Sequence, residues 1–560
     1  MKNKTKFFRL FGTSVFLFGL LALLLSGLRN WESEAPALTD LPPFTEYENG
    51  TPKMESVLYR VLQIHINQGI EKAKEFASLH DIEMENDFLR IVVQARSLSM
   101  CLDVKAMAHM VSSQIEALGG RVEASAGGNV QCVLSLDALE NLVCYPTVKY
   151  IRLPLNPYPM VTSEGVARTG ADQWHGLPSY RQEETSKVCI LDAGFKGYKS
   201  LLGSELPPSI ERRSFRSDGK LNSSKHGTAC AEIVHDMAPE ANLWLINFNT
   251  DMEHHDAVNW IIDQGIDIVS YSIGWFNIGA GDGTGPICED VRRASESGII
   301  WVSAAGNQAQ DHWQGRFKDS DDDRWHNFAS DDEILSFSVS ANQSIRVFMS
   351  WSDWGTWNGV DYSGSDQDYD LYLYRWTGTN WIQADKSTNR QTGSQWPTES
   401  IAIKSTNQKA TWGIAIRKYK ANKNAKFNVH ILNTSAPIEY YKLRGSLVIP
   451  ADSPDAIAVG ATSWQDDSFH MYSSRGPTAD ETIKPDLVAP SGVSGITYGT
   501  SGFFGTSASA PHVAGAFALI LTKTPFTLGQ IKNILYERAL DLGSSGKDNM
   551  FGLGRLRLTR

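Results

Sequence analysis

Three residues whose types together perform nucleophilic catalysis lie in separate blocks of this chain: Asp192, His226 and Ser507. A serine hydroxyl is a weak nucleophile unless a base takes its proton, and an imidazole is the natural base near neutral pH. A carboxylate that accepts a hydrogen bond from the other ring nitrogen holds the imidazole in one tautomer. These residue types therefore predict acyl transfer through a serine intermediate, provided that the fold brings the three side chains together.

A fourth residue, Asn307, is suited to stabilise the oxyanion that forms during acyl transfer. Its side-chain amide would be one donor and the backbone N–H of Ser507 the other. Ser507 lies between a glycine turn and the apolar stretch 513–521, which is expected to be a helix whose positive end favours an anion. Pro511 is expected in the first turn of this helix, where the missing N–H of proline is not needed.

The elements around these residues indicate an α/β domain with a mostly parallel sheet. Asp192 ends an apolar strand, His226 opens a small-residue helix, and Asn307 closely follows another strand. Helical patterns lie between the strands, and the carboxyl ends of parallel strands share one edge of a sheet. The expected buried strands are 188–191, 266–269, 299–302 and 456–460.

The blocks resemble those of the subtilisin-like serine peptidases, whose triad comes in the order Asp, His, Ser. The resemblance covers about 165–308 and 445–560 and includes the segments 473–477 and 484–490. It implies a serine endopeptidase with that family's fold, a mostly parallel sheet flanked by helices. The implied catalytic residues are Asp192, His226, Ser507 and the oxyanion donor Asn307, and the implied substrate-binding residues are Ser272, Ile273, Gly274, Ala304, Ala305 and Gly306.

The chain departs from the family pattern at three places. Ala193 follows the catalytic Asp where Ser or Thr is usual, and Ala229-Cys230 replaces His-Val. Trp275 stands where a small residue is common, so it is expected to narrow or reshape the pocket for the residue before the scissile bond. Cys230 lies one helical turn after His226, and three interpretations are open: a free thiol beneath the triad, a buried apolar cysteine, or a bridge to Cys189.

The length of 560 residues predicts several domains. Nine of the sixteen tryptophans lie between Trp313 and Trp412, where apolar residues alternate with a period of two, as in an antiparallel β-sandwich. The region 56–160 resembles the family's propeptides, which chaperone folding and then block the active site. The expected divisions are a signal peptide or membrane anchor (1–29), a linker (30–55), a propeptide-like α+β domain (56–160), a catalytic domain in two parts (165–308 and 445–560) and an inserted β-sandwich (310–440).

The N-terminus predicts export. Lys2, Lys4, Lys6 and Arg9 precede an apolar run over 10–28, which is typical of a signal peptide, with an uncleaved membrane anchor as the alternative. The positive-inside rule then puts the rest of the chain outside the cytoplasm, secreted or held at the outer face of the membrane. The net charge of −11 argues against broad binding to nucleic acids.

The expected partners are protein or peptide substrates and the chain's own N-terminal domain, which self-cleavage in the 154–187 connection is expected to separate. No cofactor is expected to be required, and calcium is an open question at two acidic runs. Asp319, Asp321 and Asp323 alternate as in a calcium loop but lack the turn glycine, so a solvated loop is favoured, as it is for a second run. That second run consists of Asp366, Asp368 and Asp370.

Two alternatives from other functional classes are open. The chain could be a catalytically silent surface protein that binds through its β-sandwich, although the complete set of catalytic residue types argues against this. It could also transfer its acyl group to an amine instead of water, which nothing in the sequence favours.

Overall fold

The computed structural model describes residues 53–80, 82, 84–85, 87–96, 104–154, 158–159, 165–180 and 185–559. Lys53–Arg560 form one compact unit. The predicted signal or anchor, nearly all of the predicted linker, and Cys101 lie outside the described residues.

A seven-stranded sheet organises the part of the chain that carries the four predicted catalytic residues. Its strand order is β22-β21-β12-β10-β7-β9-β8, and all neighbours are parallel. The predicted parallel sheet is therefore confirmed. The strands are β7 (Lys187–Asp192), β8 (Glu211–Ser214), β9 (Asn242–Asn247), β10 (Ile268–Tyr271), β12 (Ile300–Ala304), β21 (Ala456–Ser463) and β22 (Leu487–Ser491).

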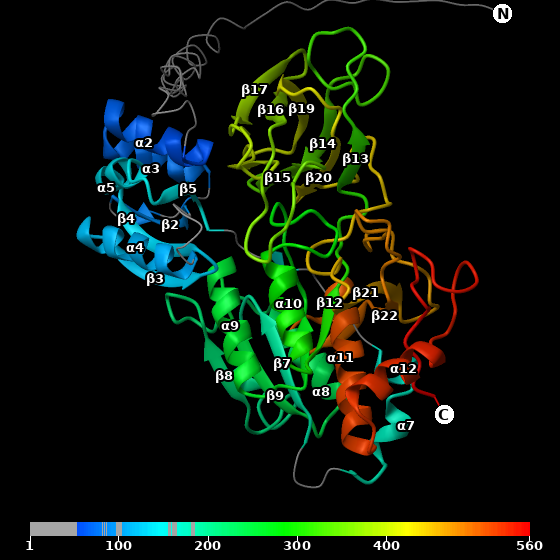
Figure 1. Cartoon of the computed structure of the whole chain (residues 1–560). Helices are drawn as coiled ribbons and strands as arrows, with labels where there is room; N and C mark the ends of the chain where they lie inside the picture. The colour runs from blue at the N-terminus through cyan, green and yellow to red at the C-terminus, as the bar shows by residue number, and fades with distance from the viewer. Residues whose placement is uncertain are drawn as a thin grey trace, which may run out of the picture. The chain divides into compact units, whose positions relative to one another are not determined.

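Helices cover both faces of this sheet (Figure 1). One face packs against α8 (His226–Met237) and α11 (Thr506–Lys523), and the other against α9 (Asp251–Asp263) and α10 (Pro286–Glu296). Because both faces are covered, β10 is buried along its whole length and β7 at every residue after Lys187, which explains their apolar sequences. Shorter elements complete this part: α6 (Val166–Thr169), α7 (Asp172–His175), η2 (Tyr198–Ser200), β11 (Ile273–Gly274), β23 (Val493–Gly495), β24 (Gly499–Phe503) and α12 (Leu528–Arg538).

The start of α11 corrects one expectation. The helix begins at Thr506, so Pro511 lies inside it and not in its first turn. The residues around Ser507 themselves form that first turn.

The region between β12 and β21 folds as the predicted antiparallel β-sandwich (Figure 1). Its two sheets have the orders β13-β20-β15-β18 and β14-β19-β16-β17, and one hydrophobic core draws on both. Burial alternates residue by residue along β15, as a strand with one covered face requires. The strands are β13 (His312–Arg316), β14 (Leu335–Val339), β15 (Ser344–Trp351), β16 (Asp368–Trp376), β17 (Trp381–Ser387), β18 (Thr398–Lys404), β19 (Ala410–Lys420) and β20 (Lys426–Leu432).

The sandwich is an insertion in the parallel sheet. Trp301 of β12 pairs with Ala456 of β21, so the chain leaves the sheet after one strand and returns to the neighbouring position.

Residues 53–154 form the expected α+β unit. Its sheet has the order β1-β2-β4-β3, with β5 paired to β2. The predicted hairpin is confirmed, and its turn uses Gly127 and Gly128, whose φ values of 53° and 85° favour glycine. The elements are α2 (Ser56–Gln68), α3 (Ile70–Leu79), β1 (Met84–Glu85), β2 (Phe88–Ala95), α4 (Val104–Ala117), β3 (Arg121–Ala126), β4 (Asn129–Ser135), α5 (Leu136–Val143) and β5 (Val148–Arg152). The predicted domain boundaries stay proposals.

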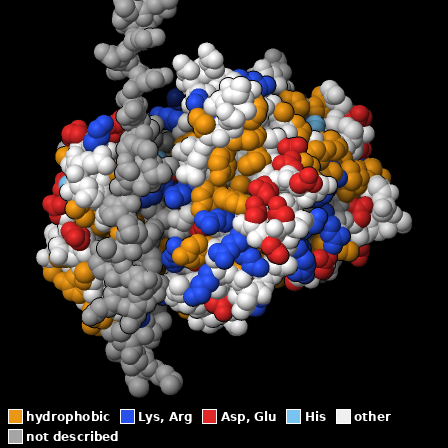
Figure 2. All heavy atoms as spheres, turned by 90° about the horizontal axis from the view of Figure 1, so that it is seen from above, with side chains coloured by type: hydrophobic (Ala, Val, Ile, Leu, Met, Phe, Trp, Pro, Cys, Tyr) orange, Lys and Arg blue, Asp and Glu red, His pale blue; other side chains and the backbone are white. Residues whose placement is uncertain are grey.

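The described surface carries both charge signs. Seen from above, basic and acidic side chains lie next to one another, with hydrophobic side chains among them (Figure 2). Within the described ranges, no helix combines the length and the apolar character needed to cross a membrane.

Candidate active site

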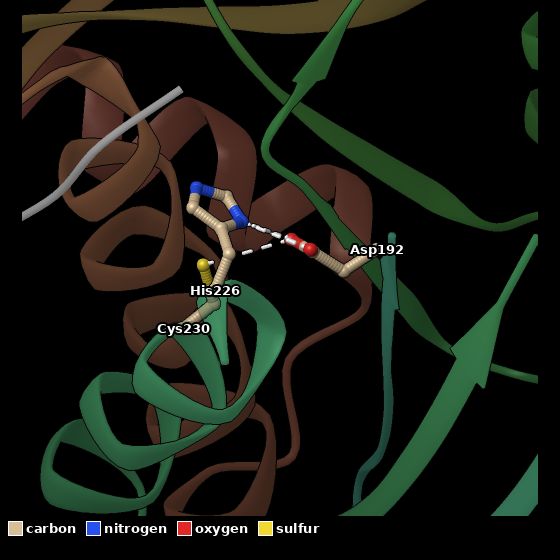
Figure 3. Close-up of side chains that lie close together, drawn as sticks. All are labelled: Asp192, His226 and Cys230. Carbon is tan, nitrogen blue, oxygen red and sulfur yellow. Dashed lines mark hydrogen bonds and ion pairs between the residues drawn. The ribbon is translucent and has the colours of Figure 1, made fainter. Parts of the chain in front are cut away.

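Asp192 and His226 form a direct pair at the carboxyl edge of the sheet. Asp192 is the last residue of β7 and is fully buried, and His226 is the first residue of α8. Nδ1 of His226 lies 2.8 Å from Oδ2 and 2.9 Å from Oδ1 of Asp192. The other ring nitrogen points away from the carboxylate (Figure 3). This is the arrangement in which a carboxylate holds an imidazole so that its second nitrogen can exchange protons.

The pair is close because α8 approaches the end of β7 through a glycine. A Cβ at Gly227 would lie 2.6 Å from Cε1 of Phe195 and 2.8 Å from Cβ of Asp192. A larger residue after His226 would therefore push the imidazole away from the carboxylate.

Ser507 is the second residue of α11 and is fully buried. Its backbone carbonyl loses its usual helical donor because Pro511, four residues later, has no N–H. The Ser272 hydroxyl donates to this carbonyl at 2.8 Å, and Sγ of Cys230 lies 3.7 Å from it. The internal proline thus frees a carbonyl that two neighbouring segments use to position the serine.

The contacts of Cys230 show that the segments carrying Asp192, His226 and Ser507 lie close together. Its Sγ contacts Oδ2 of Asp192 at 3.8 Å and the Ser507 carbonyl at 3.7 Å, while its own helix begins with His226. A ring nitrogen of His226 also lies within 4.8 Å of this sulfur, so Asp192, His226 and the backbone of Ser507 gather around one thiol. The Ser507 hydroxyl donates to the backbone carbonyl of Ser272 at 3.3 Å.

The Asn307 side chain is oriented by the residue next to Ser507. Its Oδ1 accepts from the Thr506 backbone N–H at 2.8 Å and from the Thr506 hydroxyl at 3.2 Å. An amide nitrogen cannot accept these bonds, so Oδ1 faces Thr506 and the NH₂ group faces away from it. Asn307 is thus held with its donor available to a ligand.

Gly306, the residue before Asn307, lets the backbone pass close to Ser474. Its φ of 116° favours glycine, and a Cβ would lie 2.6 Å from Oγ of Ser474. Its N–H donates to Oγ1 of Thr506 at 3.1 Å, which closes a small network around Asn307.

The two predicted substrate-binding segments differ in their surroundings. Ile273 and Gly274 form β11, which pairs antiparallel with β6 (Tyr158–Pro159) from the connection after the N-terminal unit. Ala304 and Ala305 are fully buried, and the backbone of Ala305 bonds to Val459 and Val448. A substrate-binding role for either segment stays a prediction.

Trp275 places its indole in the core. Its indole is buried, donates to the Tyr271 hydroxyl at 2.6 Å and stacks on Phe248 with ring centroids 6.0 Å apart. These partners belong to the core on the α9 and α10 side of the sheet. The ring thus packs mainly into the core, and its effect on the substrate pocket stays a prediction.

Cys230 is a free, buried thiol, and Cys189 is also free, so the disulfide alternative is wrong. Burial, together with the negative charge of Asp192, raises the pKa of the Cys230 thiol well above its ordinary value. The group therefore stays a thiol that donates to Asp192. Ligand atoms of Asp192, His226 and Cys230 lie within 4.8 Å of one another, and we assign no metal to them.

The two acidic runs differ. Ligand atoms of Asp319, Asp321 and Asp323 lie within 4.8 Å of one another, on a largely exposed loop. In the second run Asp366 is exposed, whereas Asp368 is buried and paired with Arg390 at 3.3 Å. Among the described residues, only the first run brings three carboxylates within 4.8 Å of one another, and neither run is assigned a metal.

Two positioning roles were not predicted from the sequence. Thr506 orients Asn307, and the Ser272 hydroxyl holds the Ser507 carbonyl. A signal existed for the second, because a proline inside a helix leaves the carbonyl four residues earlier in need of another donor.

Known proteins resemble the part of the chain that holds these residues. The model of the subtilase family matches residues 183–554. A subtilisin of Bacillus pumilus is 32% identical over 190 residues, which is 33% of this chain and 60% of the relative. Subtilisin E of Bacillus subtilis (strain 168) is 31% identical over 190 residues, covering 33% of this chain and 43% of the relative. The match thus spans less than two thirds of these relatives.

Among solved structures, the Clostridium perfringens CspB protease aligns with a TM-score of 0.46 and 16% identity. The alignment covers 70% of this chain and 97% of that protein.

Proposed function

The chain belongs to the subtilase family of serine peptidases, and from this premise we propose that it is an exported endopeptidase with the triad Asp192, His226 and Ser507. The observation that carries the proposal is the 2.8 Å contact between Nδ1 of His226 and the buried carboxylate of Asp192. This pair lies beside the first turn of the helix that holds Ser507. Carboxylate, imidazole and alcohol are the three groups that acyl transfer through serine requires.

In the proposed reaction, the Ser507 hydroxyl leaves its hydrogen bond to the Ser272 carbonyl and donates to Nε2 of His226 instead. It then gives its proton to that nitrogen. Oγ bonds to the substrate carbonyl carbon, whose oxygen becomes an oxyanion held by the Asn307 amide and the Ser507 N–H. The imidazolium then protonates the leaving amine, the C–N bond breaks and an acyl-enzyme is left. Water then attacks the acyl-enzyme, with His226 again acting first as base and then as acid. This step releases the carboxylic acid and restores the Ser507 hydroxyl.

The form of the substrate follows from β11. This segment pairs antiparallel with a neighbouring extended segment, which is how an extended peptide binds to an exposed strand. Such pairing uses backbone groups and requires no chain end, so it favours cleavage inside a polypeptide.

The test is digestion of an unfolded protein by the processed chain after its N-terminal fragment has been separated from it, with identification of the new termini by mass spectrometry. We expect cuts at internal bonds. Folded, processed protein that is free of the fragment and cuts nothing would refute the peptidase, and removal of terminal residues alone would refute the endopeptidase. Addition of an amine nucleophile separates transfer from hydrolysis, because hydrolysis gives free carboxyl termini.

We further propose that the chain removes its own N-terminal unit. Tyr158 and Pro159 pair with Gly274 and Ile273, the segment to which substrates are expected to bind. Residues of the connection therefore lie along the proposed substrate strand, and the bonds that follow Pro159 are the expected cleavage point. The expected cleavage point is thus narrowed to one part of the 154–187 connection. Until it is released, the N-terminal unit acts as an intramolecular inhibitor.

Export is proposed from the N-terminal sequence alone. Four basic residues precede the apolar run 10–28, and either a cleaved signal or a retained anchor would bring the catalytic part outside the cytoplasm. The mass of the mature protein distinguishes the two.

A further inference from the structure

The inserted β-sandwich contacts the N-terminal unit through one buried aspartate on β17. Oδ1 of Asp385 accepts from Nη1 of Arg60 in α2 at 2.9 Å, and Oδ2 lies 2.9 Å from Nε2 of His80, directly after α3. The side chain of Asp385 is 4% exposed, and those of Arg60 and His80 are 12% and 8% exposed. Both oxygens of one carboxylate therefore contact basic side chains of the other unit.

His80 connects its own helix to the sandwich. Its Nδ1 lies 2.8 Å from the backbone carbonyl of Phe76. Its Nε2 lies 2.9 Å from the Asp385 carboxylate, so both ring nitrogens are engaged. Burial opposes ionisation of Asp385, but the hydrogen bond from His80 and the charge of Arg60 hold the pKa of this carboxyl below its ordinary value. We define Arg60, His80 and Asp385 as the clasp.

The cationic groups are held in place within the N-terminal unit. The Phe76 ring stacks on His80 with centroids 4.0 Å apart, and the Arg60 guanidinium lies 4.8 Å from the centroid of the same ring. Arg60 also donates to the Lys386 backbone carbonyl at 3.1 Å. The clasp is therefore a pair of pre-organised basic side chains around one buried acceptor and not a flexible surface ion pair.

Further contacts join the same two units. Lys149 of β5 pairs with Asp361, whose other oxygen accepts from the Trp396 indole at 2.7 Å. The backbone N–H of Ser56 donates to Oδ1 of Asn389. The sandwich thus meets the N-terminal unit at three separate places.

The N-terminal unit also binds the α/β part independently. Arg152 pairs with Asp251, the first residue of α9, and Thr250 donates to Gln131 at 2.7 Å. The unit is therefore held by two surfaces, the start of α9 and the β17 side of the sandwich.

We propose that the inserted sandwich is a second docking surface for residues 53–154 and keeps this unit bound after the connection has been cut. The proposal rests on the proposed self-processing, because cleavage after Pro159 separates the clasp into two chains: Arg60 and His80 on one, Asp385 on the other. The processed protein then persists as an inhibited complex, and breaking the clasp controls the release of active enzyme. Truncation of one partner of a buried charge pair acts mainly on the dissociation rate, because the remaining charge stays buried without its partner.

The experiment uses the full chain with Ser507→Ala and with residues 160–164 replaced by the recognition sequence of an unrelated site-specific protease. That protease cuts the connection, and the dissociation rate of the N-terminal fragment is followed by size-exclusion chromatography and native mass spectrometry. The variants are Asp385→Asn, Arg60→Gln and both together, with Asp321→Asn as a matched change of an exposed sandwich aspartate. Thermal unfolding of each uncut variant checks that the sandwich still folds.

With Asp385 intact, we expect the two fragments to co-elute. Asp385→Asn and Arg60→Gln should each speed dissociation on the order of 10²-fold, the double variant little more than either alone, and Asp321→Asn not at all. Immediate release of the fragment from the chain with an intact clasp, or equal rates with and without Asp385, would overturn the proposal. Because cutting does not use the chain's own activity, this result is independent of whether the proposed peptidase function holds.

Discussion

Replacement of Ser507 by Ala is expected to abolish both hydrolysis of added substrates and removal of the N-terminal unit. The variant loses the only atom of the proposed triad that bonds to the substrate, while Asp192 and His226 keep their 2.8 Å contact. We expect kcat to fall on the order of 10⁴-fold or more. The measurement is kcat on a peptide substrate, together with the intact mass of protein made in a protease-free host. The active chain should begin shortly after Pro159, and the variant should keep residues 53–154.

Ser509→Ala is the matched control. Ser509 follows Ser507 closely in α11, is also buried, and donates to the Ala489 carbonyl at 3.0 Å. Its loss should lower the free energy of unfolding by about 1 kcal/mol and leave processing intact. Normal processing of the Ser507 variant would refute self-cleavage, and hydrolysis at the rate of the unmodified chain would refute the nucleophile.

Replacement of Asn307 by Ala is expected to lower kcat about 10²–10³-fold with little change in KM, which is the magnitude known for loss of such a donor in a subtilisin. The reason is that the amide NH₂, turned away from Thr506, would donate to the oxyanion and not to the ground-state substrate. Steady-state kinetics separate the two parameters, since an interaction made only in the transition state affects kcat.

Asn307→Asp separates catalysis from structure. An aspartate keeps both acceptor bonds from Thr506, at 2.8 and 3.2 Å in the native protein, but has no N–H to donate. If Asn307 is an oxyanion donor, Asp should be as deficient as Ala. If Asp restores activity, the residue only supports Thr506 and the oxyanion assignment is wrong.

Much of the catalytic half of the fold could be predicted from sequence. The strands around Asp192 and Asn307 are short, apolar and separated by helices, and this pattern specifies a parallel sheet with its functional residues at one edge. The alternation along β15 likewise specifies a strand with one buried face. These signals are local, so they can be read without knowing which segments meet.

Features set by contacts between distant segments could not be predicted. Gly505, Thr506 and Ser507 have weak helix propensity, so the sequence places the start of α11 too late; tertiary bonds to Ser507 and Asn307 outweigh propensity there. The indole of Trp275 lies in the core because it donates a hydrogen bond to Tyr271 and stacks on Phe248. Arg60 and Asp385 are 325 residues apart in the sequence, and no pattern near either residue predicts their contact.

The identity of the residue that reacts with a fluorophosphonate tests the proposed triad most directly. Processed protein, separated from its N-terminal fragment, is treated with the probe and digested, and the modified peptide is sequenced by mass spectrometry. Convergence of Asp192, His226 and Ser507 predicts one adduct, on Oγ of Ser507, and none when the protein is unfolded beforehand. A folded protein that is free of the fragment and takes up no probe, or carries it on another serine, would contradict the account.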